Sequence, residues 1–467
     1  MLSVILKHGC RNNRAAKAKR ACKIAAAVFL CHFMLGALNY IYADGDPWYR
    51  ILWHHYYQDE GKIEQVCLGS SHVYCDINPS LLDAADGTYH FNMSSPGQCL
   101  NGSYYLLREA ARGNRLSHVY LELYYICSVK DNFNGDIDPA CNAANYSRNW
   151  QNTDYMRPSL NKLSYIRAIG GREDYPDILL PFARYRSSLD NWDFVRNTIE
   201  KKKQLPYKAY EHHADHGDGN GYDEYLGQGY FYSTREFLEE QRLFGQSIVL
   251  EERPMGSTSE AYIRRILAFC KKKGIQATLF ISPIDDLQLV STEGYDHYIS
   301  QVRGIAEEYR VDFYDFNLAK EKYLPIQDGK YFRDVGHLNG AGADLFTPFF
   351  QKVVSGRKED SESCFYASYE EKLSKMAPAV YGLYFRDLPV SEESPEPSRR
   401  YVIASNRAEG MEYRVSVKPA EGEEYTVLGF GEEKSFVLPQ EQHGVCTVTC
   451  REPGRGGAVI QTLHINY

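Results

Sequence analysis

Val66-Cys67-Leu68-Gly69-Ser70-Ser71-His72 is the stretch that decides the fold. Its apolar half predicts a buried strand, and the small residues after Leu68 predict a tight turn. Further strand and helix patterns alternate along the chain. Strands are expected at 119–125, 277–281 and 311–316, and helices at 102–112, 257–273 and 294–309. This alternation predicts an α/β fold, a parallel sheet covered by helices on both faces, with its active site at the carboxyl ends of the strands.

Ser71 stands on this turn and is the candidate nucleophile. A serine hydroxyl is a poor nucleophile at neutral pH, so acyl transfer needs a base within hydrogen-bonding distance and a group that orients the base. The stretch 69–72 alone does not decide the matter, because small residues after a strand commonly form nothing more than a turn.

A second segment, 332–343, supplies the base. Asp334 lies three residues before His337 and can accept a hydrogen bond from its Nδ1, which leaves Nε2 free to take a proton from Ser71. The alternative is a helix-capping aspartate beside a loop histidine, since an apolar helix is expected from Asp344.

A third segment, 91–98, again follows an extended run and leads into a helix. Gly97 in this segment lets a backbone N–H approach a developing oxyanion, alongside the backbone N–H of Ser71. Taken alone it is equally consistent with an ordinary loop glycine. The order of all three segments along the chain favours the catalytic interpretation.

In these segments the sequence resembles the SGNH/GDSL hydrolase superfamily over about 62–354. Three blocks of the family pattern match in order, at Ser71, Gly97, and Asp334 with His337. The sequence most resembles the membrane-anchored branch that includes the D-alanine transfer protein of teichoic acid synthesis and the alginate O-acetylation proteins. The resemblance implies a flavodoxin-like three-layer α/β/α sheet and a serine esterase or O-acyltransferase. Its substrate would be acyl groups, acetyl foremost, of cell-surface polysaccharide, with a membrane-bound acyltransferase as a conceivable partner and no cofactor.

One block departs from the family pattern. Where many members carry Gly-x-Asn-Asp, this chain has Leu121-Glu122-Leu123-Tyr124-Tyr125, so the asparagine that donates to the oxyanion is absent and Glu122 or Tyr124 occupies its neighbourhood. Loss of one such donor costs about 100- to 1000-fold in rate. The alternative of a catalytically weak SGNH-fold surface protein that binds glycan or a membrane acyltransferase therefore stays open.

The N-terminus predicts the compartment. A basic tail at 1–23 precedes an uncharged apolar run at 24–42, which is about the length that a bilayer-spanning helix needs. The sequence therefore predicts a single-pass anchor in the cell membrane. By the positive-inside rule the basic tail is cytoplasmic and the rest of the chain is extracellular. The alternative is a cleaved signal peptide, for which 41–43 would supply the cleavage site.

The remaining organisation follows from composition. The 467 residues are expected to form an SGNH-like domain at 44–356, a connecting segment and linker at 357–398 and a small β-sandwich at 399–467. An insertion at about 132–256, helical around 192–203, is expected to cap the active site. Its His/Asp run at 212–218 is interpreted as a solvated loop rather than a metal site.

The charge pattern excludes one class of partner. Net charge is −8 and the only basic concentration lies at the N-terminus, so no nucleic acid is expected. No Cys/His spacing suits zinc, so no metal is expected either. The 38 tyrosines fit ordinary packing or a carbohydrate surface.

Overall fold

The strand at Gln65–Gly69 lies inside a five-stranded parallel sheet of order β10-β8-β3-β1-β2. Its strands are β1 (Gln65–Gly69), β2 (His90–Ser94), β3 (His118–Glu122), β8 (Gln276–Ile281) and β10 (Asp312–Asp315). Numbered along the chain, this is the 2-1-3-4-5 order of flavodoxin-like folds, whose topological switch point lies between β1 and β3. The predicted α/β fold class is confirmed.

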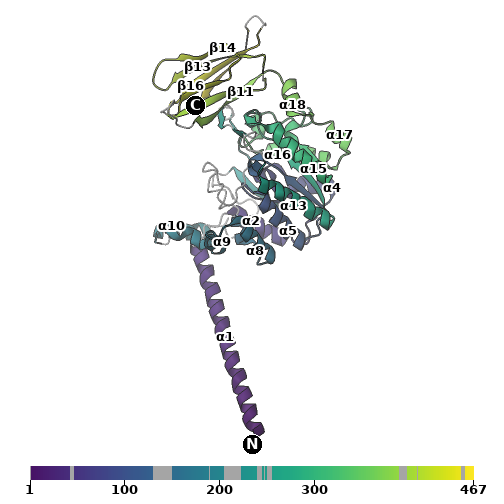
Figure 1. Ribbon diagram of the computed structural model, residues 1–467, viewed down its shortest axis with the longest axis vertical. Coiled ribbons are helices and arrows are strands. Elements are labelled where there is room, and N and C mark those ends of the chain that lie inside the picture. Colours follow the sequence, from purple (N-terminus) through teal and green to yellow (C-terminus); the bar gives the residue numbers. More distant parts are fainter. Residues whose placement is uncertain are drawn as a thin grey trace.

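The structure is a computed structural model (Figure 1). It describes residues 2–42, 47–129, 150–188, 190–203, 222–238, 244–246, 248–249, 255–388, 397–407, 409–453 and 458–467. The His/Asp run at 212–218 therefore lies outside the described residues.

Helices cover both faces of the sheet because side chains alternate along each strand. Val66 and Leu68 of β1 point into one apolar core, and Cys67 points into the other. The first core is closed by α2 (Pro47–Gln58), α5 (Leu100–Gly113), α13 (Ser257–Lys273) and α15 (Tyr295–Tyr309). The second is closed by α3 (Ser71–Asp76), α4 (Pro79–Asp86) and α16 (Gly340–Ser355). The result is three layers.

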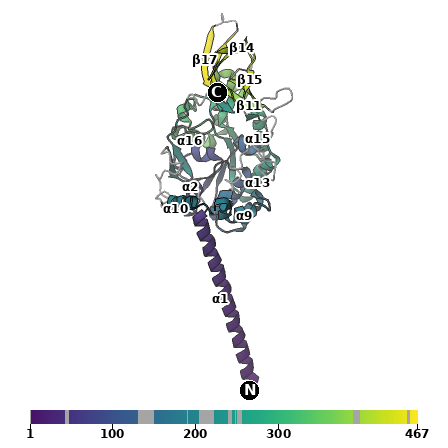
Figure 2. The same cartoon turned by 90° about the vertical axis from the view of Figure 1, so that its left-hand side faces the viewer.

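Helix α1 (Leu2–Tyr42) projects from one end of the molecule, and the C-terminal strands form the opposite end (Figures 1 and 2). Its segment Lys17–Tyr42 is long and apolar enough to cross a membrane, as judged by length and composition; a signal sequence has the same character. The helix thus extends well before the predicted apolar run at 24–42.

Two sheets pack face to face at the C-terminal end. One has the order β15-β12-β11-β6 and the other the order β14-β13-β16-β17. The strands are β6 (Phe244–Gln246), β11 (Val380–Leu388), β12 (Ser398–Ser405), β13 (Glu412–Pro419), β14 (Tyr425–Gly431), β15 (Ser435–Pro439), β16 (Gly444–Arg451) and β17 (Val459–Asn466). Ile403, Val415 and Val448 lie in their shared core.

The segment expected as a connection is itself structured. It contains α17 (Lys358–Glu362), α18 (Tyr369–Lys375) and β11, and β11 pairs with β6 of the insertion in parallel and with β12 in antiparallel. Short elements complete the fold. These are α6 (Tyr125–Val129), β7 (Ile248–Val249), α14 (Asp286–Val290), β9 (Thr292–Glu293), η2 (Phe316–Leu318) and η3 (Gly329–Tyr331).

Besides the short strands β6 and β7, the insertion between β3 and β8 has two larger described parts. One part contains the helices α8 (Leu160–Ile169), α9 (Tyr175–Leu179), η1 (Pro181–Ser188) and α10 (Trp192–Lys203). Helix α8 packs against α5, η1 and α10 pack against α1, and α9 packs against η1. The hairpin of β4 (Asp223–Gly227) and β5 (Tyr230–Ser233) and the residues that follow it contact the loop that carries Asp334: Asp223 pairs with Arg333, and the Phe237 N–H donates to the Phe332 carbonyl. The helix expected around 192–203 is confirmed as α10, whereas the role of the insertion as a cap over the site stays a prediction.

The start of α16 leaves no room for a side chain at Gly342. The Gly342 N–H donates to Asn339, the N-cap, and an added Cβ would overlap the carbonyl oxygen of Tyr331. We expect Gly342→Ala to lower the free energy of unfolding by about 1–3 kcal/mol through overpacking. Gly304, exposed inside α15 with nothing near its Cβ position, is the matched control, and Gly304→Ala should raise stability by about 0.5–1 kcal/mol. Denaturant unfolding of both variants measures this, and equal effects would contradict it.

Candidate active site

Ser71 begins helix α3 directly after strand β1. The strand end lies close to its neighbour β3: a Cβ at Gly69 would be 2.6 Å from Cβ of Glu122 and 2.7 Å from Cγ2 of Val73. Only glycine fits there. The chain therefore turns tightly, and the partly exposed Ser71 side chain lies at the carboxyl edge of the sheet.

His337 and Asp334 lie next to this serine, as their spacing predicts. Ser71 Oγ is 2.6 Å from His337 Nε2, and His337 Nδ1 is 2.7 Å from Asp334 Oδ1. The structure therefore brings the three predicted catalytic side chains into one hydrogen-bonded chain. His337 is 24% exposed and Asp334 46%, so solvent reaches the site.

Asp334 is held as an anion. Its Oδ1 also accepts the backbone N–H of Gly336 at 2.9 Å and of His337 at 3.0 Å, and Arg333 Nε lies 3.8 Å from Oδ2. Burial alone would raise the pKa of this carboxyl, but the His337 ring, these N–H donors and the Arg333 guanidinium together hold it well below its usual range. A charged carboxylate here stabilises an imidazolium.

Hydrogen bonds and an ion pair with other elements hold the loop that carries Asp334 and His337 in place. The backbone N–H of Leu338 donates to Oδ1 of buried Asp76, at the end of α3, over 3.0 Å. Arg333 Nη2 lies 3.2 Å from Asp223 Oδ2 in strand β4. Since Asp76 belongs to the helix that starts at Ser71, the nucleophile and the base are tied to each other by a second route.

Gly97 lies in the turn between β2 and α5. The register pairs Gly69 with Ser94, so Ser71 and Gly97 follow neighbouring strand ends, and Gly97 has a left-handed φ of 59° that favours glycine. Both residues therefore lie at the same edge of the sheet. The role of their N–H groups as the oxyanion hole remains a prediction.

Glu122, at the end of β3, contacts the turn before Ser71. Its Oε2 accepts the N–H of Ser70 at 3.2 Å and the Ser70 hydroxyl at 3.1 Å. Burial raises the pKa of Glu122 to about 7, even though the two Ser70 bonds oppose the shift. The Glu122 carboxyl thus stabilises the turn that precedes Ser71.

His72 is the residue that sequence reasoning missed. Its ring lies between Tyr124, at 4.0 Å between centroids, and His337, which it stacks at 4.6 Å and 25°. Burial, and to a lesser extent the neighbouring His337 ring, hold the pKa of His72 well below its usual range, so His72 stacks as a neutral ring. Its Nδ1 is 3.0 Å from Ser70 Oγ, which joins it to Glu122. The only signal was its position next to Ser71.

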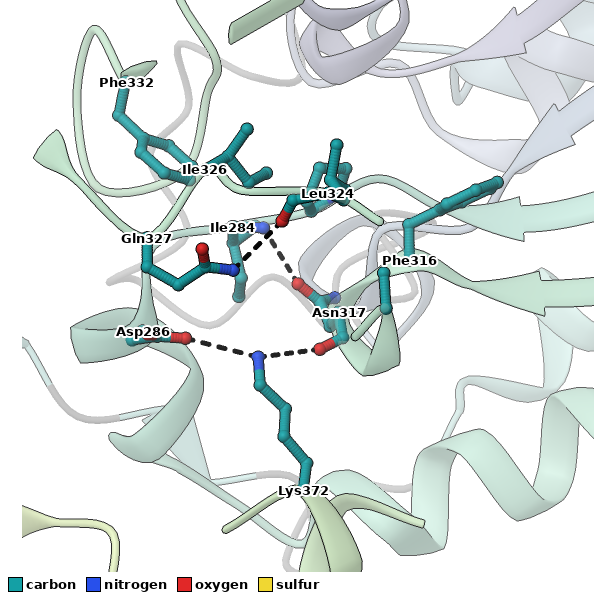
Figure 3. Close-up of a pocket in the computed structure, with 11 residues that line it drawn as sticks. Ile284, Asp286, Phe316, Asn317, Leu324, Ile326, Gln327, Phe332 and Lys372 are labelled. Atoms are coloured by element: carbon teal, nitrogen blue, oxygen red, sulfur yellow. Dashed lines mark hydrogen bonds and ion pairs between the residues drawn. The ribbon is translucent and has the colours of Figure 1, made fainter. Parts of the chain in front are cut away.

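A small cavity lies beside this region (Figure 3). It has a volume of about 20 Å³, room for a single water, and is lined in part by Ile284, Phe332 and Lys372. Lys372 Nζ lies 3.3 Å from Asp286 Oδ1 and donates to the Asn317 carbonyl at 2.8 Å. The cavity is too small for a substrate, and its ion pair joins α18 to the loops after β8 and β10.

Among the described residues, no group of three or more His, Cys, Asp and Glu side chains is placed to hold a metal. No family model and no curated protein matches the chain. One similar solved structure is that of a candidate acylhydrolase from Bacteroides fragilis, which is 9% identical over 62% of this chain and 86% of that chain with a TM-score of 0.28. A likeness of this size carries no argument about function.

The raised pKa of Glu122 predicts a pH-dependent stability. A group whose folded pKa, about 7, exceeds its ordinary value of 4.5 stabilises the fold fully at low pH, and that contribution is lost as the pH rises through 7. Relative to Glu122→Gln, which does not titrate, the wild type should lose about 2–3 kcal/mol between about pH 5 and 8. Denaturant unfolding at each pH measures the difference.

The variant Ser70→Ala tests the cause of the Glu122 pKa shift separately. It removes the hydroxyl that favours the charged carboxylate, so the loss of stability should move to higher pH than in the wild type. Parallel curves for the wild type and Glu122→Gln would show that Glu122 does not titrate as argued.

Proposed function

We propose that the protein is a membrane-anchored serine enzyme of the SGNH/GDSL type that acts on acyl groups, acetyl foremost, of cell-surface polysaccharide. The observation that carries this proposal is the hydrogen-bonded chain from Ser71 Oγ through His337 to Asp334. The order of the matching blocks in the sequence and the switch point beside β1 support the type.

The geometry suits acylation of the serine. His337 Nε2 takes the hydroxyl proton as Ser71 Oγ attacks the ester carbonyl, and the resulting imidazolium is stabilised by Asp334. The N–H groups of Ser71 and Gly97 would donate to the oxyanion. Collapse of the tetrahedral intermediate breaks the ester C–O bond, and His337 gives its proton to the departing alcohol. An acyl-Ser71 ester remains.

The second half of the reaction, deacylation of Ser71, reverses these steps with a new nucleophile. His337 removes a proton from the incoming hydroxyl, which attacks the acyl carbon, and the proton returns to Ser71 Oγ as the enzyme is released. Water as nucleophile gives an esterase, and a sugar hydroxyl gives an O-acyltransferase. Both use the same three side chains.

A groove near the site offers space for the rest of a polymer. It has a volume of about 480 Å³ and is lined from the α/β layers by Asp285 and Glu321 and from the C-terminal sheets by Tyr381 and Gln461. The N–H of Asp285 donates to the carbonyl of Val335, so the groove adjoins the loop of Asp334 and His337. Tyrosine and carboxylate groups suit neutral or amino sugars.

The alternative function is a surface protein that binds glycan or a membrane acyltransferase without catalysis. Such a protein has no need of a histidine held between a charged carboxylate and a serine hydroxyl. Groups with strongly perturbed ionisation that face a nucleophile are typical of catalytic sites. The hydrogen-bonded triad therefore favours the enzyme.

Labelling with a fluorophosphonate probe tests the nucleophile. We expect the full chain in detergent to take up one probe at Ser71, as seen by intact mass, and Ser71→Ala and His337→Ala to abolish uptake because they remove the nucleophile and its base. Exposed Ser374 and His297 provide matched controls, and their alanine variants should label normally. A folded wild type that takes up no probe would favour the binding function.

Asp334→Asn tests the charge on the orienting group. Asparagine can still accept the N–H groups of Gly336 and His337, but it cannot stabilise an imidazolium, so the rate of acetyl ester hydrolysis should fall by about 10³- to 10⁴-fold. Turnover of a chromogenic acetyl ester measures this. A fall of less than about tenfold would remove Asp334 from the proposed mechanism.

A further inference from the structure

Large apolar side chains are exposed on the described part of the insertion that lies near α1. Leu160 is 82% exposed, Leu163 55%, Leu179 54% and Trp192 77%. They belong to α8, α9 and α10 of the insertion. Single exposed apolar residues are ordinary on soluble proteins, but a group of this size on adjacent elements indicates a surface that meets something other than water.

Two helices of this part, η1 and α10, contact the end of the candidate membrane span. The N–H of Phe182 in η1 donates to Asn39 Oδ1 at 3.1 Å, and Lys202 Nζ in α10 donates to the Tyr40 carbonyl at 2.7 Å. Figures 1 and 2 show α9 and α10 on either side of this end of α1. The exposed group therefore lies where a helix that crosses a bilayer would emerge.

Helix α10 has three distinct faces. Val195, Thr198 and Lys202 are buried against the protein. Trp192, Arg196, Ile199 and Lys203, spaced four, three and four residues apart, share a second face and are exposed or half-exposed. The acidic Asp193 and Glu200 lie on a third face, where Glu200 pairs with Lys203 at 2.7 Å.

The second face has the composition of a membrane interface. Tryptophan prefers the headgroup level of a bilayer, because its ring is apolar and its N–H finds a partner there. Arginine and lysine place their stems along apolar surface and their charges among headgroups. A helix with one such face and acids turned aside lies in the plane of the membrane surface.

We propose that α10, together with the exposed leucines of α8 and α9, rests on the headgroup layer of the bilayer that α1 crosses, with Trp192 as its anchor. This inference rests on α1 being a membrane span. A second attachment beside α1 limits rotation of the extracellular part about the anchor, so the site at β1 keeps a defined height above the membrane.

Tryptophan fluorescence of the full chain in vesicles tests the contact. The chain has four tryptophans: Trp48, Trp53 and Trp150 are at most 9% exposed, and Trp192 is 77% exposed. Vesicles of phosphatidylcholine with brominated acyl chains should quench the component of the emission that Trp192→Phe removes. Acrylamide in the water should quench that component little.

A matched variant moves the reporter to the other end of the molecule. Tyr425 is 44% exposed on β14 of the C-terminal sheets, so Trp192→Phe/Tyr425→Trp carries an exposed tryptophan far from α1. Its extra emission should be quenched by acrylamide and not by brominated lipid. Flotation of the vesicles shows separately whether α1 is inserted.

Three results would overturn the proposal. In the first, the protein floats with the vesicles but acrylamide alone quenches the Trp192 emission. This face then lies in water, although α1 is inserted in the membrane. Emission that responds to neither quencher means that a protein partner or a second copy covers the face. Chain that does not float removes the span and this inference together. Fluorophosphonate labelling of Ser71, which Trp192→Phe should not alter, keeps each result separate from the proposed catalysis.

Discussion

The hydrogen bond between Ser71 Oγ and His337 Nε2 joins side chains 266 positions apart, and the geometry of the site depends on it. No local structure could hold it. Ser71 is placed by the parallel pairing of β1 with β2 and β3, and His337 by a loop that starts after β10. The bond from Leu338 N–H to Asp76 connects the two placements directly, because Asp76 ends the helix that Ser71 begins. A shift in either element would separate base and nucleophile.

Three carboxyl groups, those of Asp334, Glu122 and Asp76, lie near this bond. Their environments shift their pKa values in different directions. Hydrogen bonds, the His337 ring and the Arg333 guanidinium lower the pKa of Asp334, whereas burial raises the pKa of Glu122 to about 7 and that of Asp76 well above its usual value. Negative charge is therefore concentrated on the carboxylate that faces His337. Groups whose environments push their pKa values apart commonly have different roles. Here Asp334 serves the base, while Asp76 and Glu122 hold backbone.

The sequence predicted what depends on periodicity and on short spacing. The helix at 257–273 matches α13, and the strand at 277–281 matches β8 within a residue, because each has a regular apolar pattern and a turn at its end. The contact of Asp334 with His337 follows from three residues of separation. The stack of His72 on His337 and the bonds of Glu122 to Ser70 were not predictable. They join polar side chains on different elements, and no periodic pattern marks such pairs.

The insertion between β3 and β8 shows the same limit of prediction from sequence. Its polar, irregular sequence suggested one cap, but its described parts contact three distant regions. Helix α10 holds the end of α1, Asp223 pairs with Arg333 beside the triad, and β6 adds a strand to β11 of the C-terminal sheets. A single segment thus contacts α1, the loop of Asp334 and His337, and the C-terminal sheets, and it links their positions. The position of the loop that carries Asp334 and His337 therefore depends in part on contacts with the insertion, which no local sequence pattern marks.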